Sequence, residues 1–424
     1  MNYFDAVRFL ENLQRGKIRT NFKKIKEALE ELDNPHKKFS SIHIAGTNGK
    51  GSTAVMVHSI LTEAGYKSGI YTSPHILDFT ERIKVSCKPI PKRTVTGYVE
   101  KLNLLFKKYK CTYFEAVTII SFVYFYEQSV DIAVVETGMG GTWDATSLVN
   151  PIITVITDIG LEHTRYLGNT VKEIAAEKGG IIKTSTDCIV GASNTEAVNT
   201  LKKIAKSKKT DFYAVSRYAV AKPVKMCING TSFNYRQKNF SLQNLYIPLT
   251  GLHQVKNART AVFTVNKLRE KGFSLNNKHI ISGLKNLDIS GRFEIINRYP
   301  YVICDVGHNP DAFKTIKITI KKLFPSKMIF LLFGAKSDKD YLSMVRIIKP
   351  VCKKIIGVSL KEKQSFEPET LIPLFKKTKV QYSVFDSCDD GLKFFLKNAV
   401  KDDIIVTAGS HLIVEETKKY FRRL

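Results

Sequence analysis

The residues best suited to chemistry form a glycine-rich turn, GTNGKGST, at residues 46–53. The turn follows an apolar run, residues 41–45, that is typical of a buried parallel strand, and it precedes a segment whose apolar positions suit a helix packed on a sheet. A strand, a glycine turn, a lysine, a hydroxyl and a helix are the parts of a phosphate-binding loop. Lys50 would reach the outer phosphates, and Ser52 or Thr53 would meet a magnesium ion.

This turn departs from the general phosphate-loop pattern at two positions. Ile44 stands where the pattern has its first glycine, and Gly51 stands where a serine or threonine directly follows the lysine. The turn is therefore either a specialised phosphate loop or a plain connection between a strand and a helix. The run from Lys50 to Thr53 favours the phosphate loop.

Polar residues also follow three other strand-like segments, which are residues 68–71, 131–136 and 152–157. Open α/β sheets bind ligands at the carboxyl ends of their strands. If these ends meet near the turn, Ser73, Glu136 and His163 offer two oxygens and a nitrogen able to hold Mg²⁺ beside ATP. The alternative is that each residue merely caps its own strand.

A capping box formed by Thr170 and Glu173 predicts a helix that runs to about Lys178. From the residues alone, Lys178 is interpreted as a solvated lysine that stabilises the carboxyl end of this helix. The following span, residues 212–247, has short apolar runs and a turn at residues 229–230, which indicates an antiparallel insertion.

A second unit of strand-like and helical segments begins near Arg298. Its expected strands are residues 302–305, 328–333, 354–358, 382–385 and 403–407. Asp305 and His308 lie just past the first of these strands, where a ligand site is expected. The link between the two units, residues 287–292, contains Gly291 and is interpreted as a hinge.

Composition limits the class of protein. A chain of 424 residues, 43% hydrophobic and 25% charged, predicts a globular α/β protein with two domains. No apolar run approaches a membrane span and no secretory signal is visible, so we expect a cytoplasmic protein with reduced cysteines and no membrane partner. The net charge of +27 raises the question of nucleic acid, but the lysines are scattered and no nucleic-acid motif accompanies them.

In their order, these motifs resemble folylpolyglutamate synthase and the bifunctional dihydrofolate synthase of the Mur-ligase superfamily. Residues 46–52 read as that family's phosphate loop, GTNGKGS. Further similar segments are YTSPH at 71–75, FTERI at 79–83, FEAVT at 114–118, ETGMGG at 136–141, DAT at 144–146, LGNT at 167–170, IAAEK at 174–178, HQVKNA at 253–258, GRFE at 291–294 and DVGHNP at 305–310. The resemblance covers nearly the whole chain.

The resemblance implies the fold and the domains. We expect an ATP-binding central domain of phosphate-loop type over residues 1–290, with a doubly wound, mainly parallel sheet and the small antiparallel insertion. A Rossmann-like α/β ligase domain is expected over residues 291–424. The chain would act as a monomer.

The resemblance also implies the residues of the site. ATP would contact Gly49, Lys50, Gly51, Ser52, Asn257, Arg292 and Asp305. Two magnesium ions would be held by Ser73, Glu136, His163 and Lys178, with Lys178 carbamylated into an anionic ligand. The pterin-bearing substrate would lie beside Thr112, Tyr113, Phe114 and Glu115, and catalysis would rest on Lys50, Lys178 and His308.

The implied reaction is the ATP-dependent ligation of L-glutamate to folate, and to dihydropteroate as a second acceptor. Thr142, Ser147, Glu162 and Val306 depart from the family pattern. Three alternatives remain at this point: an amino-acid ligase of another Mur branch, a nucleotide-dependent protein acting on nucleic acid, and a family member without activity. The sequence does not choose between dihydropteroate, reduced folate or both, and it gives neither the polyglutamate length nor the oligomeric state.

Overall fold

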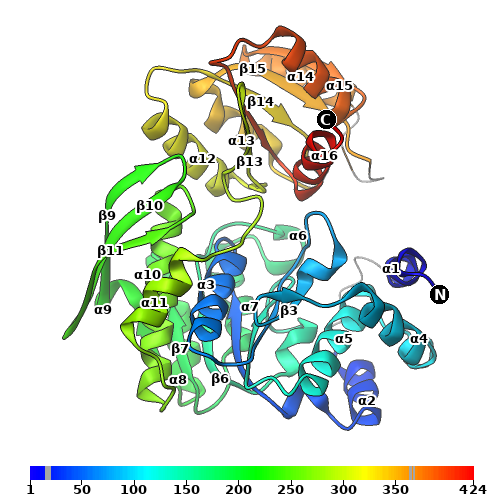
Figure 1. Ribbon diagram of the computed structural model, residues 1–424, viewed down its shortest axis with the longest axis vertical. Helices are drawn as coiled ribbons and strands as arrows, with labels where there is room; N and C mark the ends of the chain where they lie inside the picture. The colour runs from blue at the N-terminus through cyan, green and yellow to red at the C-terminus, as the bar shows by residue number, and fades with distance from the viewer. Residues whose placement is uncertain (15–20, 362–364, 366–367) are drawn as a thin grey trace. The chain divides into compact units, whose positions relative to one another are not determined.

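The computed structural model describes residues 1–14, 21–361, 365 and 368–424 (Figure 1). The chain forms two compact units. The first consists of residues 1–222, 234–245 and 256–287, and the second of residues 223–233, 246–255 and 288–424. Each unit is built on its own sheet.

An eight-stranded sheet forms the centre of the first unit. Its strands are β1 (Ser40–Ala45), β2 (Ser68–Tyr71), β3 (Ile83–Val85), β4 (Lys88–Pro89), β5 (Ile132–Glu136), β6 (Pro151–Ile156), β7 (Asp187–Val190) and β8 (Asp211–Ala214). Their order is β4-β3-β2-β5-β1-β6-β7-β8; β3 pairs antiparallel with both β2 and β4 at one edge, and the other neighbouring strands pair in parallel. The doubly wound, mainly parallel sheet expected from the sequence is thus confirmed. Because β1 lies between β5 and β6, the glycine turn after β1 has a strand end on each side.

Helices surround this sheet. They are α1 (Tyr3–Asn12), α2 (Lys23–Glu31), α3 (Lys50–Glu63), α4 (Lys92–Lys108), α5 (Tyr113–Glu127), α6 (Thr164–Leu167), α7 (Val171–Lys178), α8 (Thr195–Ser207), α9 (Val215–Tyr218), α10 (Leu252–Glu270) and α11 (Asn277–Lys285). Short 3₁₀ turns are η1 (Pro35–Lys37), η2 (Phe79–Arg82), η3 (Ala145–Leu148) and η4 (Gly179–Ile181). Helix α3 packs against α11, and α7 packs against α8 (Figure 1). Helix α5 is apolar around most of its circumference and lies in a cluster with α4 and α1, which explains its burial.

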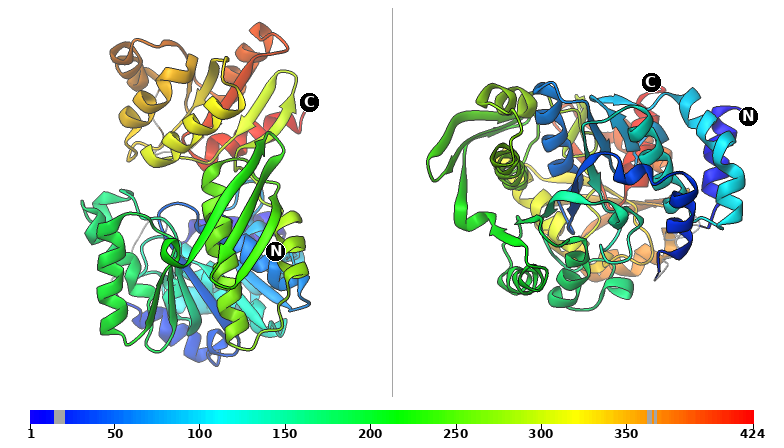
Figure 2. Two further views of the ribbon diagram at one scale, coloured as in Figure 1. Left: turned by 90° about the vertical axis from the view of Figure 1, so that its left-hand side faces the viewer. Right: turned by 90° about the horizontal axis from the view of Figure 1, so that it is seen from below.

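A separate three-stranded sheet contains β9 (Ala219–Cys227), β10 (Gly230–Gln237) and β11 (Phe240–Ile247) in the order β11-β10-β9 (Figure 2, left). Two residues separate each pair of successive strands, which makes the pairs antiparallel hairpins. The expected insertion therefore exists, but its start at residue 212 is wrong. Phe212 belongs to β8, where it pairs with Cys188 of β7.

A six-stranded sheet forms the second unit. Its strands are β12 (Glu294–Arg298), β13 (Tyr301–Cys304), β14 (Ile329–Phe333), β15 (Cys352–Val358), β16 (Gln381–Phe385) and β17 (Ile404–Ala408). The order is β12-β13-β17-β14-β15-β16, all parallel except β12. The helices are α12 (Pro310–Leu323), α13 (Tyr341–Ile348), α14 (Pro368–Thr378), α15 (Cys388–Asn398) and α16 (His411–Phe421), with the 3₁₀ turn η5 (Lys349–Val351). All five expected strands are present, and the half-buried edge strand β12 is additional.

Two further properties concern the whole described chain. Across its described residues, no helix combines the length and apolarity that a membrane crossing needs. All seven cysteines are free thiols, five of them buried.

Candidate nucleotide and metal site

The glycine turn after β1 has the geometry of a phosphate loop. Gly49 has φ 88° and precedes the first residue of α3, and no side chain caps that helix. The amide groups at the start of α3 are therefore available to an anion. A Cβ atom on Gly49 would lie 2.4 Å from Oδ1 of Asn257 in α10, so glycine is required both by the backbone conformation and by this neighbour.

Thr47 fixes the loop to the neighbouring strand end. Its backbone N–H donates to the carbonyl of Asp158 at 2.7 Å, and its hydroxyl contacts the carbonyl of Gly160 at 3.0 Å. The segment that leads to His163 is thereby held against the phosphate loop. Thr47 was not among the expected site residues, although its place inside the loop was a signal.

Two lysines converge on one backbone oxygen of this loop. Nζ of Lys50 donates to the carbonyl of Gly46 at 2.9 Å, and Nζ of Lys178 donates to the same carbonyl at 2.8 Å. Lys50 also donates to the carbonyl of Thr47 at 3.2 Å. Two ammonium groups so close together repel each other, and an anion placed beside them would relieve that repulsion.

The interpretation of Lys178 as a solvated lysine is wrong, because its side chain is 2% exposed. Burial, together with the charge of Lys50, lowers the pKa of Lys178 to about 7. Tight packing at the end of α7 fixes the position of Lys178, which is the last residue of this helix. A Cβ on Gly180 would lie 2.5 Å from Cα of Thr142, and the hydroxyl of Thr142 donates to the carbonyl of Glu177. A buried lysine with this pKa is partly neutral near neutral pH, and a neutral amine is nucleophilic.

Glu136 and Ser73 meet at the ends of two paired strands. Glu136 is the last residue of β5 and is 4% exposed. Its Oε2 accepts a hydrogen bond from the backbone N–H of Ser73 at 3.2 Å. The expectation that these strand ends come together is met for this pair, because β2 and β5 are neighbours.

His163 lies at the start of α6 in a left-handed conformation, with φ 48°. Its Nε2 lies 3.9 Å from Oε1 of Glu162, which is 8% exposed. A buried carboxylate therefore lies beside the histidine.

The residues fit a magnesium site in part. Carboxylate and hydroxyl oxygens suit Mg²⁺, which in nucleotide sites usually takes one or two carboxylates and completes its shell with phosphate and water. Across the described ranges, no three His, Cys, Asp or Glu side chains converge as a metal cluster. An ion here would therefore draw on the oxygens of Ser73 and Glu136 together with those of a nucleotide.

The segment expected to lie beside the acceptor opens α5. Thr112 and Glu115 form a capping box, in which each side chain accepts a hydrogen bond from the other residue's backbone. The ring of Phe114 packs on Gly138, where a Cβ would lie 2.5 Å from the ring, and the guanidinium of Arg82 lies 5.5 Å from the centre of the Tyr113 ring. Thr112 and Glu115 thus cap the start of α5, and the rings of Tyr113 and Phe114 make the contacts with Arg82 and Gly138.

Asp144 organises the loop that follows Glu136 and was not assigned a role from the sequence. Its carboxylate accepts hydrogen bonds from the backbone of Met139 and Thr146, and the hydroxyl of Thr146 lies 2.8 Å from Nε2 of His43. Burial raises the pKa of Asp144, against these hydrogen bonds. The order Asp-Ala-Thr at residues 144–146 is typical of an aspartate that caps a short helical turn, and it could have indicated this role from the sequence.

The second unit holds Arg292, Asp305 and His308 in one cluster. Oδ2 of Asp305 accepts from the N–H of Phe293 at 3.0 Å, and Oδ1 accepts from the N–H of Gly307 at 2.8 Å. Burial raises the pKa of Asp305, while the positive charge of Arg292 opposes that rise. Nδ1 of His308 lies 2.9 Å from the carbonyl of Val306, and this fixes the ring. Asn257, which is also expected to contact ATP, lies against Gly49 in the first unit.

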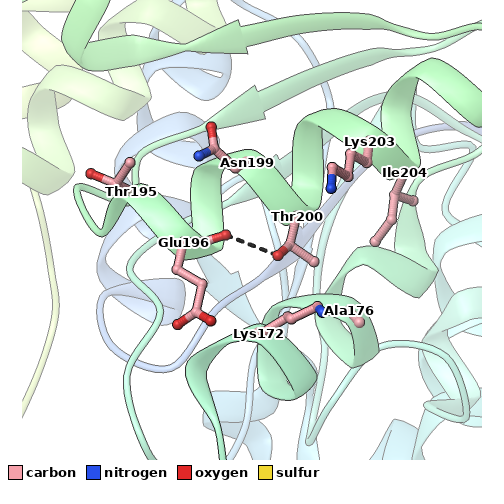
Figure 3. A pocket seen from close by; sticks show the side chains of 8 residues that line it. All are labelled: Lys172, Ala176, Thr195, Glu196, Asn199, Thr200, Lys203 and Ile204. Atoms are coloured by element: carbon pink, nitrogen blue, oxygen red, sulfur yellow. Dashed lines mark hydrogen bonds between the residues drawn. The ribbon is translucent and has the colours of Figure 1, made fainter.

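A surface hollow between α7 and α8 contains none of the expected site residues (Figure 3). Its walls are Lys172 and Ala176 of α7, and six residues of α8 from Thr195 to Ile204. Most of these side chains are exposed, and the marked hydrogen bond, from the hydroxyl of Thr200 to the carbonyl of Glu196, is internal to α8. The hollow therefore has no buried polar group to bind a ligand.

Comparison with known families finds two matching domains along the chain. The Mur ligase middle domain matches residues 44–265, and the Mur ligase glutamate ligase domain matches residues 291–411. The chain belongs to the Mur ligase family, in its branch of folylpolyglutamate synthases and dihydrofolate synthases.

Individual relatives agree over nearly the full length. The chain is 30% identical to the dihydrofolate synthase/folylpolyglutamate synthase of Bacillus subtilis, over 98% of each chain. The folylpolyglutamate synthase of Mycobacterium tuberculosis, solved with ADP, has a TM-score of 0.91 and 25% identity, covering 99% of this chain and 98% of that one. Escherichia coli FolC, solved with DHPP and ADP, has a TM-score of 0.89 and 26% identity, covering 100% and 99%.

Proposed function

We propose that this protein is an ATP-dependent ligase that adds L-glutamate to a folate, and that it also accepts dihydropteroate. The observation that carries the proposal is the convergence of Lys50 and the buried Lys178 on the carbonyl of Gly46, inside a phosphate loop of the folate-ligase form. Relatives crystallised with ADP and with DHPP support the nucleotide and the acceptor. The domains proposed are residues 1–290 for ATP binding and 291–424 for the ligase domain, in a cytoplasmic monomer.

The proposed chemistry activates a carboxylate. A carboxylate oxygen of the folate attacks the γ-phosphorus of ATP, the bond to the bridging oxygen breaks, and ADP leaves. The α-amine of glutamate then attacks the acyl carbon, the amine loses a proton, and inorganic phosphate leaves. Phosphorylation is needed because a carboxylate at neutral pH is a poor electrophile, whereas phosphate is a good leaving group.

The chain's own residues divide this work. The amides from Gly49 to Ser52 bind the phosphates, and Lys50 neutralises charge that develops on them. Asn257, Arg292 and Asp305 bind the nucleotide, His308 orients the transferring phosphoryl group, and residues 112–115 line the acceptor site. Catalysis in this scheme is mainly positioning and charge neutralisation.

The metal proposal assigns Ser73, Glu136, His163 and a carbamylated Lys178 to two magnesium ions. When bound, magnesium neutralises phosphate charge. The low pKa of Lys178 supports the carbamate, because only a neutral amine reacts with carbon dioxide. The carbamate converts a buried cation beside Lys50 into an anion, which changes repulsion into attraction.

An isotope-transfer experiment tests the proposed mechanism. The acceptor is labelled with ¹⁸O in its reacting carboxylate and incubated with ATP and glutamate. An acyl phosphate requires one labelled oxygen to appear in the inorganic phosphate for each amide bond formed. Amide formation with unlabelled phosphate would contradict the mechanism, and absence of the glutamylated product would contradict the function.

A further inference from the structure

A partly buried ion pair in the second unit holds the segment that carries Arg292, and the proposed reaction gives this pair no role. Nζ of Lys418, in the last turn of α16, lies 2.6 Å from Oε1 and 2.9 Å from Oε2 of Glu294, the first residue of β12. The side chain of Lys418 is 11% exposed, whereas that of the next lysine, Lys419, is 55% exposed in its pair with Glu415. The side chain of Lys418 is therefore shielded from solvent and that of Lys419 is not, whereas the two carboxylates are similarly exposed, 29% for Glu294 and 25% for Glu415.

The carboxylate of Glu294 also binds the link between the two units. It accepts a hydrogen bond from the hydroxyl of Ser290 and another from the backbone N–H of Gly291, each at 2.7 Å. Lys418 donates to the Ser290 hydroxyl as well. Burial works to raise the pKa of Glu294, but Lys418 and the two hydrogen bonds outweigh it and lower the pKa overall. Glu294 therefore stays ionised and holds four donor contacts.

Backbone hydrogen bonds anchor the other side of the same segment. The carbonyl of Gly291 accepts from the N–H of Val306 at 3.0 Å, and the N–H of Phe293 donates to Asp305 at 3.0 Å. Phe293 is buried and has φ 51°, a conformation that a bulky residue keeps only where its surroundings hold it. Arg292 is thus flanked on both sides by residues that are fixed to the second unit.

We propose that Lys418 and Glu294 are positioning residues that clamp residues 290–293 onto the second unit and so hold the guanidinium of Arg292 for the nucleotide. The inference rests on the proposed role of Arg292 in ATP binding. It replaces the interpretation of Gly291 as a hinge, because both backbone polar groups of Gly291 are bonded within the second unit.

The test compares Lys418→Met, which keeps the aliphatic stem and removes the charge, with Lys419→Met as the matched control on the same helix. Hydrogen exchange of the amides of Gly291, Phe293 and Val306 should quicken about tenfold or more in Lys418→Met and stay unchanged in the control. The apparent KM for ATP should rise about tenfold in Lys418→Met, with the KM for glutamate within about twofold. Lys418→Arg should restore both values in part.

The two readouts separate the clamp from the proposed function. Exchange needs no turnover, so an inactive protein whose exchange quickens in Lys418→Met would contradict the ligase assignment and retain the clamp. Unchanged exchange in Lys418→Met overturns the clamp, as does quickened exchange with an unchanged KM for ATP. If Lys418→Met fails to fold, Ser290→Ala removes one hydroxyl from the clamp and is judged by the same measurements, with faster exchange expected at Gly291.

Discussion

Lys50 and Lys178 donate hydrogen bonds to the same acceptor, the carbonyl oxygen of Gly46, at 2.9 and 2.8 Å. One lysine comes from the start of α3 and the other from the end of α7, so the fold brings together two cations that are far apart in the sequence. Burial and the charge of Lys50 outweigh the carboxylates of Glu162, Asp144 and Glu177 and lower the pKa of Lys178 to about 7, so further negative charge would stabilise the pair. Phosphate groups and a carbamate both supply that negative charge, and the predictions below follow from this relationship.

Lys50→Ala removes the cation that is proposed to neutralise the outer phosphates. We expect kcat/KM for ATP to fall by about a hundredfold or more, because one positioned charge contributes several kcal/mol to a phosphoryl-transfer transition state. His163→Ala should likewise abolish acyl-phosphate formation. Circular dichroism should show little change in fold. Near-normal phosphate release by either variant would contradict the role proposed for the substituted residue.

Lys178→Ala tests the carbamate. The variant should lose most of its activity, and a short carboxylic acid such as acetate should restore part of it, since the free carboxylate takes the place of the carbamate. In the wild type, ¹³C-bicarbonate should give a carbamate resonance that is absent from the variant. An unmodified lysine combined with no rescue would refute the carbamate and leave Lys178 as a cation.

A comparison of Gly49→Ala with Gly65→Ala distinguishes the effect of backbone strain from that of steric contact. Gly49 and Gly65 both have positive φ, 88° and 86°, so alanine at either position costs about 1–2 kcal/mol of stability. Only at Gly49 does the new Cβ meet a neighbour, Asn257, and nothing lies within 4 Å at Gly65. Titration with ADP should therefore show weakened binding for Gly49→Ala and wild-type binding for Gly65→Ala. Equal affinity in the two variants would exclude the loop as the nucleotide site.

Phe114→Ala tests the acceptor site. The ring packs on Gly138 and lies 6.0 Å from the ring of Tyr71, so its removal opens the surface beside the expected acceptor. Loss of one aromatic contact should raise the KM for the pterin substrate about tenfold and leave the KM for ATP within about twofold. Steady-state kinetics with each substrate varied in turn checks this. A rise in the KM for ATP that exceeds the rise for the pterin substrate would contradict the placement of residues 112–115 beside the acceptor.

Glu294→Gln should lower stability in a pH-dependent way. The folded-state pKa of Glu294 is lowered from its ordinary value of 4.5, so its contribution is present above 4.5 and is lost as pH falls through the lowered pKa. We expect the variant to be less stable by about 1–2 kcal/mol near pH 7. Thermal unfolding, followed by circular dichroism, should give midpoints that converge as the pH falls below 4.5 and through the lowered pKa of Glu294. A difference that persists in acid would show that the carboxylate charge is not responsible.

The sequence was sufficient to predict the two main sheets, but not all of the strands at their edges. Strands such as β1 and β14 are short apolar runs bounded by turns, and both were expected from the sequence. Strand β8 begins with an exposed aspartate, and β12 is only half-buried, so neither has a clear apolar pattern. Their pairing depends on neighbours that are distant along the chain.

The site shows a similar division. Ser73 and Glu136 could be paired from the sequence because both lie at the carboxyl ends of strands, and these ends meet at one edge of a parallel sheet. Lys178 could not be interpreted correctly from helix rules alone, because periodicity does not show that the end of α7 points at Gly46. Nor does the sequence show that the backbone of Gly291 is hydrogen-bonded to Glu294 and Val306, or that Glu294 pairs with Lys418 near the far end of the chain.

The most direct test of the proposed function is ADP release from the purified protein with ATP, glutamate and an acceptor, comparing dihydropteroate with tetrahydrofolate. Release should require both glutamate and a pterin acceptor, and it should be lost in Lys50→Ala. Mass spectrometry should find the acceptor extended by one glutamate. ADP release that is independent of glutamate, or an absence of product with both acceptors, would contradict the assignment of this chain as a folate ligase.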